Sequence, residues 1–137
     1  MVGSGDKHDE VRILIVDDEE AILRVFKTII SASLSNVHIV LARNGAEAVA
    51  SFYEYHPRII LLDLHMPVMD GLTAFQKIAE ICRTQNLKMP YVIFCTGYAP
   101  DEAVKAIVAN SSECCLIKKP VSPDKIIETI KSKLNSC

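Results

Sequence analysis

The chain has 137 residues, of which 50% are hydrophobic, and its formal net charge at pH 7 is −2. This length corresponds to one domain, which can bury a core without disulfides or structural metals. Acidic and basic residues are interspersed, so the chain has no basic stripe of the kind that binds a phosphate backbone. Direct binding to nucleic acid is therefore not expected.

The sequence carries no sign of a membrane or secreted protein. Its longest apolar runs, such as residues 59–62, are too short to cross a bilayer. No secretory signal precedes the five cysteines, whose odd number and spacing fit neither a disulfide framework nor a metal site. These are Cys82, Cys95, Cys114, Cys115 and Cys137. We expect a soluble, cytoplasmic protein with reduced thiols.

The amino-terminal segment differs in composition from the rest. Residues 1–10 are small and polar and show no apolar period, which is typical of a disordered tail or an expression remnant. The remaining residues, 11–137, are expected to form one domain.

Five short runs of apolar and β-branched residues recur along this domain. Most are apolar throughout rather than alternating, which is typical of strands buried in a parallel sheet. The predicted strands are residues 11–16, 37–42, 59–62, 91–95 and 114–117.

Each predicted strand is followed by a segment in which apolar residues recur at helical spacing. These segments are residues 22–30, 46–53, 72–82, 103–108 and 126–134. Ser122 and Pro123 open the last one, as N-cap and first helical residue. Strict alternation predicts an α/β fold, a flavodoxin-like doubly wound (βα)5 sandwich whose five-stranded parallel sheet has the order 2-1-3-4-5.

Polar residues follow four of the five predicted strands. They are Asp17, Asp18, Glu19 and Glu20 after the first, Asp63 after the third, Thr96 after the fourth, and Lys118, Lys119 and Pro120 after the fifth. Ligands of such sheets bind outside the carboxyl ends of the strands, so we expect these residues to converge at one edge. Glu19 and Glu20 are interpreted as a solvated helix start, where the helix dipole favours carboxylates.

Three of these carboxylates indicate a metal site. Asp17, Asp18 and Asp63 would repel one another when brought together, so positive charge must compensate them. Carboxylate oxygens suit Mg²⁺, and no Cys/His cluster is present to suit zinc. Mg²⁺ and the Lys119 ammonium together would neutralise the site.

Asp63 also has the placement of a nucleophile. It directly follows an apolar strand, so a rigid element would hold its side chain toward the metal. Attack of a carboxylate on phosphorus gives an acyl phosphate, with metal and ammonium offsetting the charge of the transferring oxygens. Thr96 supplies a hydroxyl that can donate to one of those oxygens.

Four short motifs stand at the ends of predicted strands: Asp17-Asp18, Asp63 within Leu-Leu-Asp-Leu-His-Met-Pro-Val-Met-Asp-Gly, Thr96-Gly97 and Lys119-Pro120. Together they resemble the response-regulator receiver family of two-component signalling, of the chemotaxis-regulator type. The likeness covers about residues 11–135, which would make residues 11–137 a receiver domain. A lone Asp-Asp or Lys-Pro pair would be weak, whereas four motifs in the right order are specific.

The resemblance implies a role for each carboxylate. Asp63 would be the phosphoacceptor, and Asp17 and Asp18 would bind Mg²⁺ together with it. The main-chain carbonyl of His65 would complete the protein ligands.

The resemblance also implies which lysine acts. Lys119 matches the family lysine because it directly precedes a proline, and alternation along the strand should point Lys118 elsewhere. Lys119 and Thr96 would assist phosphoryl transfer, and the Lys119-Pro120 peptide bond would be cis, as is typical of the family.

The implied function is signal reception in a phosphorelay. A histidine kinase or a histidine phosphotransfer protein would donate the phosphoryl group, and the domain would catalyse only its own phosphorylation and dephosphorylation. A downstream protein would then read the face formed by residues 103–108, 114–117 and 126–134. No output domain is expected within the 137 residues.

The sequence departs from the family pattern at one position and carries bulky rings at two others. Leu116 stands three residues before Lys119, where members usually carry Tyr or Phe as the aromatic half of the switch. His65 and Tyr98 stand two residues beyond Asp63 and Thr96, at positions that in this family tend to border the path of the hydrolytic water. Tyr98 either shields the acyl phosphate or is an exposed loop residue whose ring covers the surface.

Three other functions compete with the phosphoacceptor interpretation. A phosphatase of the haloacid dehalogenase type would carry its Asp-x-Asp nucleophile after the first strand rather than the third. A flavodoxin-like cofactor binder would need a glycine-rich or hydroxyl-rich phosphate loop where Asp17 and Asp18 stand. The serious rival is a pseudo-receiver, a binding module of the same fold that is not phosphorylated, for which Leu116 leaves room.

Overall fold

The computed structural model describes residues 10–135, and the predicted alternation of strands and helices is confirmed. The elements are β1 (Val11–Val16), α2 (Glu20–Ser33), β2 (Val37–Ala42), α3 (Gly45–Tyr55), β3 (Ile59–Asp63), α4 (Gly71–Gln85), β4 (Tyr91–Thr96), α5 (Glu102–Ala109), β5 (Cys114–Lys118) and α6 (Pro123–Asn135). All strand pairs are parallel, and the sheet has the predicted order β2-β1-β3-β4-β5.

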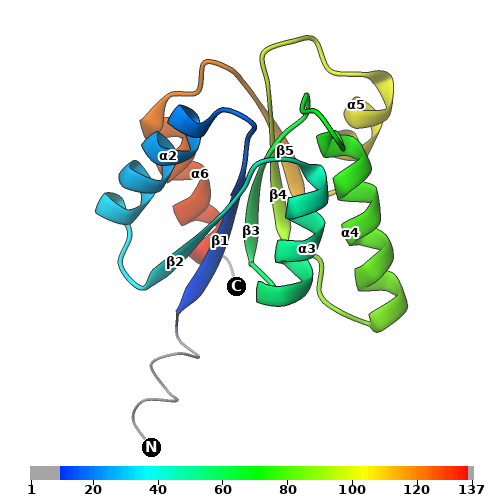
Figure 1. Ribbon diagram of the computed structural model, residues 1–137, viewed down its shortest axis with the longest axis horizontal. Helices are drawn as coiled ribbons and strands as arrows, with labels where there is room; N and C mark the ends of the chain where they lie inside the picture. Colours follow the sequence, from blue (N-terminus) through cyan, green and yellow to red (C-terminus); the bar gives the residue numbers. More distant parts are fainter. Residues whose placement is uncertain (1–9, 136–137) are drawn as a thin grey trace, which may run out of the picture.

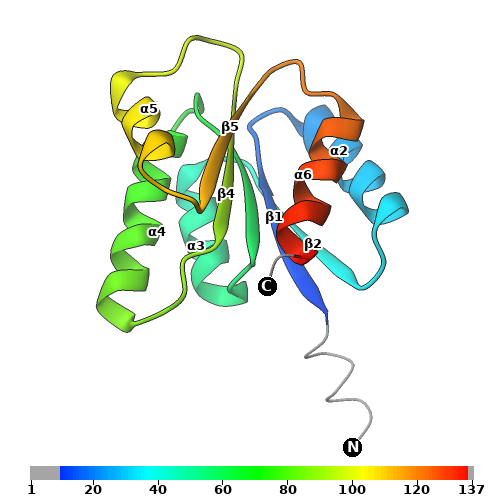
Figure 2. The same cartoon turned by 180° about the vertical axis from the view of Figure 1, so that it is seen from behind.

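Helices cover both faces of the sheet. Figures 1 and 2 show α2 and α6 on one face and α3, α4 and α5 on the other. Local side-chain bonds begin several of these helices: Asn44 and Asp70 accept from the main-chain N–H of Glu47 and Thr73, and the Ser122 hydroxyl accepts from that of Lys125 at 3.4 Å. The expected N-cap role of Ser122 is therefore confirmed.

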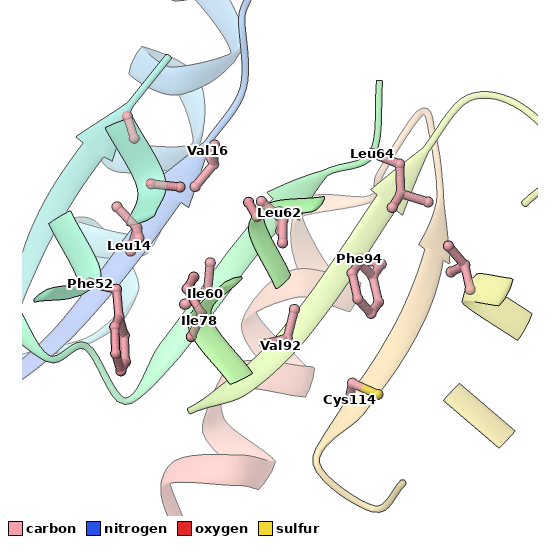
Figure 3. Close-up of a cluster of buried hydrophobic side chains, with 14 of the residues drawn as sticks. Leu14, Val16, Phe52, Ile60, Leu62, Leu64, Ile78, Val92, Phe94 and Cys114 are labelled. Atoms are coloured by element: carbon pink, nitrogen blue, oxygen red, sulfur yellow. The ribbon is translucent and has the colours of Figure 1, made fainter. Parts of the chain in front are cut away.

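Two apolar clusters fill the layers between sheet and helices. Because successive side chains of a strand point to opposite faces, Leu14 and Leu62 belong to the cluster under α3, α4 and α5 (Figure 3), whereas Ile13 and Leu61 belong to the cluster under α2 and α6. These strands are buried on both faces, which explains why their sequences are apolar throughout rather than alternating.

Three strands run one residue further than their apolar runs. Asp63, Thr96 and Lys118 each still pair in the sheet, Asp63 with Cys95 and Thr96 with Lys118. Main-chain pairing does not depend on the polarity of the side chain, so the apolar pattern ends before the ladder does. Asp63 and Thr96 are thereby fixed to strand ends rather than carried on free loops.

Some residues that were interpreted from the sequence lie outside the described range. Residues 1–9 of the expected tail and Cys137 are among these, while Glu10 is described and its carboxylate lies 3.8 Å from Nδ1 of His38. The other four cysteines are free thiols, three buried and Cys115 half-buried. Between residues 10 and 135, no helix is both long and apolar enough to span a bilayer.

Candidate functional site

The three predicted carboxylates meet at the carboxyl ends of β1 and β3. These strands are neighbours, with Val16 paired to Leu62, so the residues that follow, Asp17 and Asp63, come to lie side by side. Asp17 is 2% exposed and Asp63 is 5% exposed, while Asp18 is exposed at the rim. One carboxylate oxygen from each of the three lies within 4.8 Å of the others. The expected convergence is therefore confirmed.

Lys119 enters the same cluster from the end of β5. Its Nζ lies 2.9 Å from Oδ2 of Asp17 and 3.4 Å from Oδ1 of Asp63. The Lys119-Pro120 bond is cis, as expected, and the Lys119 main-chain N–H donates to the Thr96 carbonyl at 2.7 Å. Lys118 pairs with Thr96 in the sheet and is exposed, so the prediction that Lys118 points elsewhere is confirmed.

Burial and charge set the proton affinities in the cluster. Burial raises the pKa of Asp63, and the neighbouring Asp17 carboxylate raises it further, against the opposing effects of Lys119 and of the His65 N–H. For Lys119, burial lowers the pKa, but the hydrogen bond and charge of Asp17, with Asp63, more than offset this and the net pKa is raised. Lys119 therefore stays a cation between two buried carboxyl groups.

The charge balance of the cluster fits a divalent cation. Three carboxylates face one ammonium group among the residues that the structure describes, which leaves an excess of negative charge. The donors are all hard oxygens, the ligand class that Mg²⁺ prefers, and Asp18 at the rim leaves access for water. The main-chain N–H of His65 lies 3.4 Å from Oδ1 of Asp63, so the residue expected to give a carbonyl ligand adjoins the cluster.

Thr96 stands at the end of β4 and is 1% exposed. Its hydroxyl donates to the Tyr98 carbonyl at 3.3 Å and accepts from the Tyr98 main-chain N–H at 3.1 Å. The hydroxyl proton is therefore engaged by the loop after β4. Donation to a bound group would require that proton to leave the Tyr98 carbonyl.

His65 and Tyr98 form an aromatic contact that links the loops after β3 and β4. Their ring centroids are 4.8 Å apart with an interplanar angle of 78°, an edge-to-face arrangement, and Tyr98 remains 67% exposed. Both residues were identified from the sequence, each by its position after a strand, but the contact between their rings was not predicted.

Gly71 is a supporting residue that was not predicted from the sequence, although it ends the motif that contains Asp63. A Cβ atom there would overlap the main chain of Asp63 and Leu64, and the Gly71 N–H donates to the Leu64 carbonyl at 3.0 Å. Glycine lets α4 begin directly against the residue that carries the central carboxylate. The signal was the Asp70-Gly71 pair, in which Asp70 is the N-cap of α4.

Comparisons with known proteins agree with this geometry. The family model described as "Response regulator receiver domain" matches residues 13–131. The chain is 34% identical over 125 residues to the chemotaxis protein CheY of Bacillus subtilis, covering 90% of this chain and 98% of the relative. It is 32% identical over 122 residues to the polar-differentiation response regulator DivK of Brucella ovis, covering 89% and 94%.

A solved structure gives the same result for the fold. The CheY-like receiver domain protein of Methanospirillum hungatei superposes with a TM-score of 0.70 at 32% identity, covering 92% of this chain and 94% of that one. The likeness therefore extends over the sheet, the helices and the strand ends that carry the carboxylates.

Proposed function

The chain belongs to the response-regulator receiver domain family, and from this premise we propose that it accepts a phosphoryl group on Asp63 in a Mg²⁺-dependent reaction. One observation carries the proposal. The Asp63 carboxylate is held at a strand end, 5% exposed, 3.4 Å from the Lys119 ammonium and beside the oxygens of Asp17 and Asp18.

The proposed step is an in-line displacement at phosphorus. A carboxylate oxygen of Asp63 forms the new P–O bond while the bond from phosphorus to the donor breaks, and the donor leaves with the electron pair. The contacts from Lys119 and from the His65 N–H both fall on Oδ1 of Asp63, so we assign the attack to Oδ2. Lys119 stabilises negative charge on the transferring oxygens, and Thr96 donates to one of them after releasing the Tyr98 carbonyl.

Asp17, Asp18 and Asp63, with the main-chain carbonyl of His65, are the residues that would hold Mg²⁺. When bound, the ion offsets charge on the phosphoryl oxygens during transfer. Asp17 has a second task, because its Oδ2 fixes Lys119 at 2.9 Å and its Oδ1 accepts from the Glu19 N–H at 2.9 Å. These bonds hold the ammonium and the start of α2 in place around the reacting carboxylate.

In this proposal the domain catalyses its own phosphorylation and dephosphorylation and turns over no separate substrate. In the second half of the cycle a water oxygen attacks phosphorus, the P–O bond to Asp63 breaks, and inorganic phosphate leaves while Asp63 returns to the carboxylate. His65 and Tyr98 lie two positions beyond Asp63 and Thr96, and the contact between their rings joins the loops after β3 and β4. We propose that these two rings block the access of that water to phosphorus and so lengthen the life of the acyl phosphate.

The proposed partners follow from the same role. A histidine kinase or a histidine phosphotransfer protein donates the phosphoryl group, within a cytoplasmic two-component phosphorelay. A downstream protein binds the face formed by α5, β5 and α6. Phosphorylation shifts the population of conformations of this face. Release of Thr96 from Tyr98 couples Asp63 to the loop that leads into α5.

A second candidate rests on Leu116. This β5 residue is half-buried against the core cluster of the α3, α4 and α5 face, and its side chain cannot provide the aromatic half of the family switch. A pseudo-receiver would keep the fold and bind partners without phosphorylation. The intact cluster of Asp17, Asp18, Asp63 and Lys119 favours the phosphoacceptor.

The deciding experiment is phosphorylation by acetyl phosphate with and without Mg²⁺, read as intact mass. The expected result is one phosphoryl adduct that needs Mg²⁺ and is absent from Asp63→Asn. Asp70→Asn is the matched control, because Asp70 caps α4 outside the cluster and asparagine caps a helix equally well. It should be phosphorylated like the parent protein.

The opposite outcome is also informative. No adduct in the parent protein, together with a rise in the melting temperature on adding Mg²⁺, would overturn the phosphoacceptor role in favour of the pseudo-receiver. A rise in the melting temperature that is lost in Asp63→Asn would assign the ion to this cluster.

A further inference from the structure

A cavity lies at the opposite end of the sheet from the acidic cluster. It has a volume of about 460 Å³ and opens where β3, β4 and β5 begin. Its walls come from the connections that precede these three strands and from the end of α6, at the lower end of the sheet in Figure 1. Nothing in the phosphoacceptor chemistry uses this end of the molecule.

The inner wall of the cavity is apolar and rigid. Phe52 and Ile59 are 2% and 1% exposed, and Pro57 and Pro90 are buried beside them. Pro57 and Pro90 each fix one φ angle in the connections that precede β3 and β4. The volume lies within the range of pockets that enclose small organic ligands.

Tyr91 adds a polar edge to this wall. The Nζ of Lys133, from α6, lies 4.6 Å from the centre of the Tyr91 ring, and both residues line the cavity. A cation over the face of an aromatic ring is attracted to it. The cavity therefore offers an aromatic surface and a positive charge next to each other.

The rim of the cavity is mainly basic. Among the residues that the structure describes, Arg58, Lys88 and Lys133 line it, against the carboxylate of Glu113. This contrasts with the whole chain, which carries 17 acidic and 15 basic residues, and with the carboxylates at the other end of the sheet. Lys88 is exposed, so its ammonium can reach a group that enters from solvent.

We propose that this cavity binds a small organic anion, an aromatic ring that bears a carboxylate. The ring would pack against the apolar wall and Tyr91, and the carboxylate would lie at the rim with Lys88. A neutral molecule of the same shape would lose the ionic part of the interaction, and a cation would be repelled. The site is separate from Asp63 and would bind its ligand in the unphosphorylated protein.

The test is an NMR titration of the ¹⁵N-labelled protein with 2-naphthoate and with its neutral isostere 2-naphthamide. Saturable shifts are expected from 2-naphthoate in the main-chain amides of residues 56, 58–59, 87–89, 91 and 112–113, with 2-naphthamide binding about tenfold more weakly, the equivalent of one charge-assisted hydrogen bond. Equal affinity of the two compounds, or shifts elsewhere on the sheet, would overturn the proposal.

A charge-reversed variant provides the second arm. Lys88→Glu is expected to weaken 2-naphthoate binding about tenfold or more. Lys77→Glu makes the same charge change at an exposed position of α4 that does not line the cavity, and should bind like the parent. Unchanged affinity for 2-naphthoate in Lys88→Glu would contradict the proposed contact with Lys88. An equal loss of affinity in both variants would show that only the net charge of the protein matters, which would also overturn the proposal. Neither result depends on whether Asp63 is phosphorylated.

Discussion

The main chain of Gly71 lies directly against that of Asp63, so closely that a Cβ atom at position 71 would overlap the Asp63 carbonyl oxygen. Gly71→Ala is expected to lower the free energy of unfolding by about 1–3 kcal/mol, the usual cost of overpacking, although alanine is the better helix former. Urea denaturation measures the change. Gly97→Ala is the control, because its Cβ would meet only the Cβ of Lys119 at 3.9 Å. Equal stability of both variants would contradict the close contact.

Lys119→Met removes the cation that separates two buried carboxylates. In metal-free buffer we expect a loss of about 3 kcal/mol in the free energy of unfolding, the lower end for breaking a buried ion pair, because the Lys119 side chain is 21% exposed. Lys118→Met makes the same substitution at the exposed neighbour and should change stability by less than about 0.5 kcal/mol. Similar losses in the two variants would show that the ammonium does not stabilise the cluster.

The sequence was enough to predict the fold and the convergence of the carboxylates. Buried parallel strands impose runs that are apolar throughout, and neighbouring strands of such a sheet end at the same edge. Once β1 and β3 are neighbours, Asp17 and Asp63 must meet, because each follows the last apolar residue of its strand. The choice of Lys119 over Lys118 was implied by the resemblance to the receiver family, whose lysine directly precedes a proline.

Contacts between loops could not be predicted in the same way. The edge-to-face contact of His65 with Tyr98 and the bonds from the Thr96 hydroxyl to the Tyr98 main chain depend on loop conformations that no periodicity specifies. The packing of Gly71 on Asp63 depends on the exact angle at which α4 begins. These are tertiary relations, which a pattern along one chain does not record.

Asp63 should make the protein less stable as the pH rises. Burial, with the charge of Asp17, raises the pKa of Asp63 in the folded state, so the folded protein binds this proton more tightly than the unfolded chain. Its stabilising effect is present below the ordinary carboxyl pKa and is lost as the pH rises through the raised value. In metal-free buffer, Asp63→Asn is therefore expected to be more stable than the parent at neutral pH.

The measurement is urea denaturation of both proteins over a series of pH values with EDTA present. The advantage of Asp63→Asn should shrink as the pH falls from the raised pKa of Asp63 toward about 4, the ordinary range of a carboxyl group, and should be absent below it. Asp70→Asn, which keeps the cap of α4, is the control for the general effect of losing one carboxylate. A difference that is constant with pH, or that grows on acidification, would contradict the raised pKa of Asp63.

Tyr98→Ala is expected to shorten the life of the acyl phosphate proposed on Asp63, because it removes one of two contacting rings whose centroids lie 4.8 Å apart. Loss of the phosphoryl adduct after removal of acetyl phosphate, followed by intact mass, gives the rate. His65→Ala should also raise the rate of adduct loss. The effect of the double variant on this rate should be smaller than the sum of the two single effects, because the rings act as a pair. Tyr53→Ala, an exposed tyrosine on α3, is the control and should leave the rate unchanged. If Tyr98→Ala also leaves the rate unchanged, the ring is surface cover and water reaches phosphorus by another path.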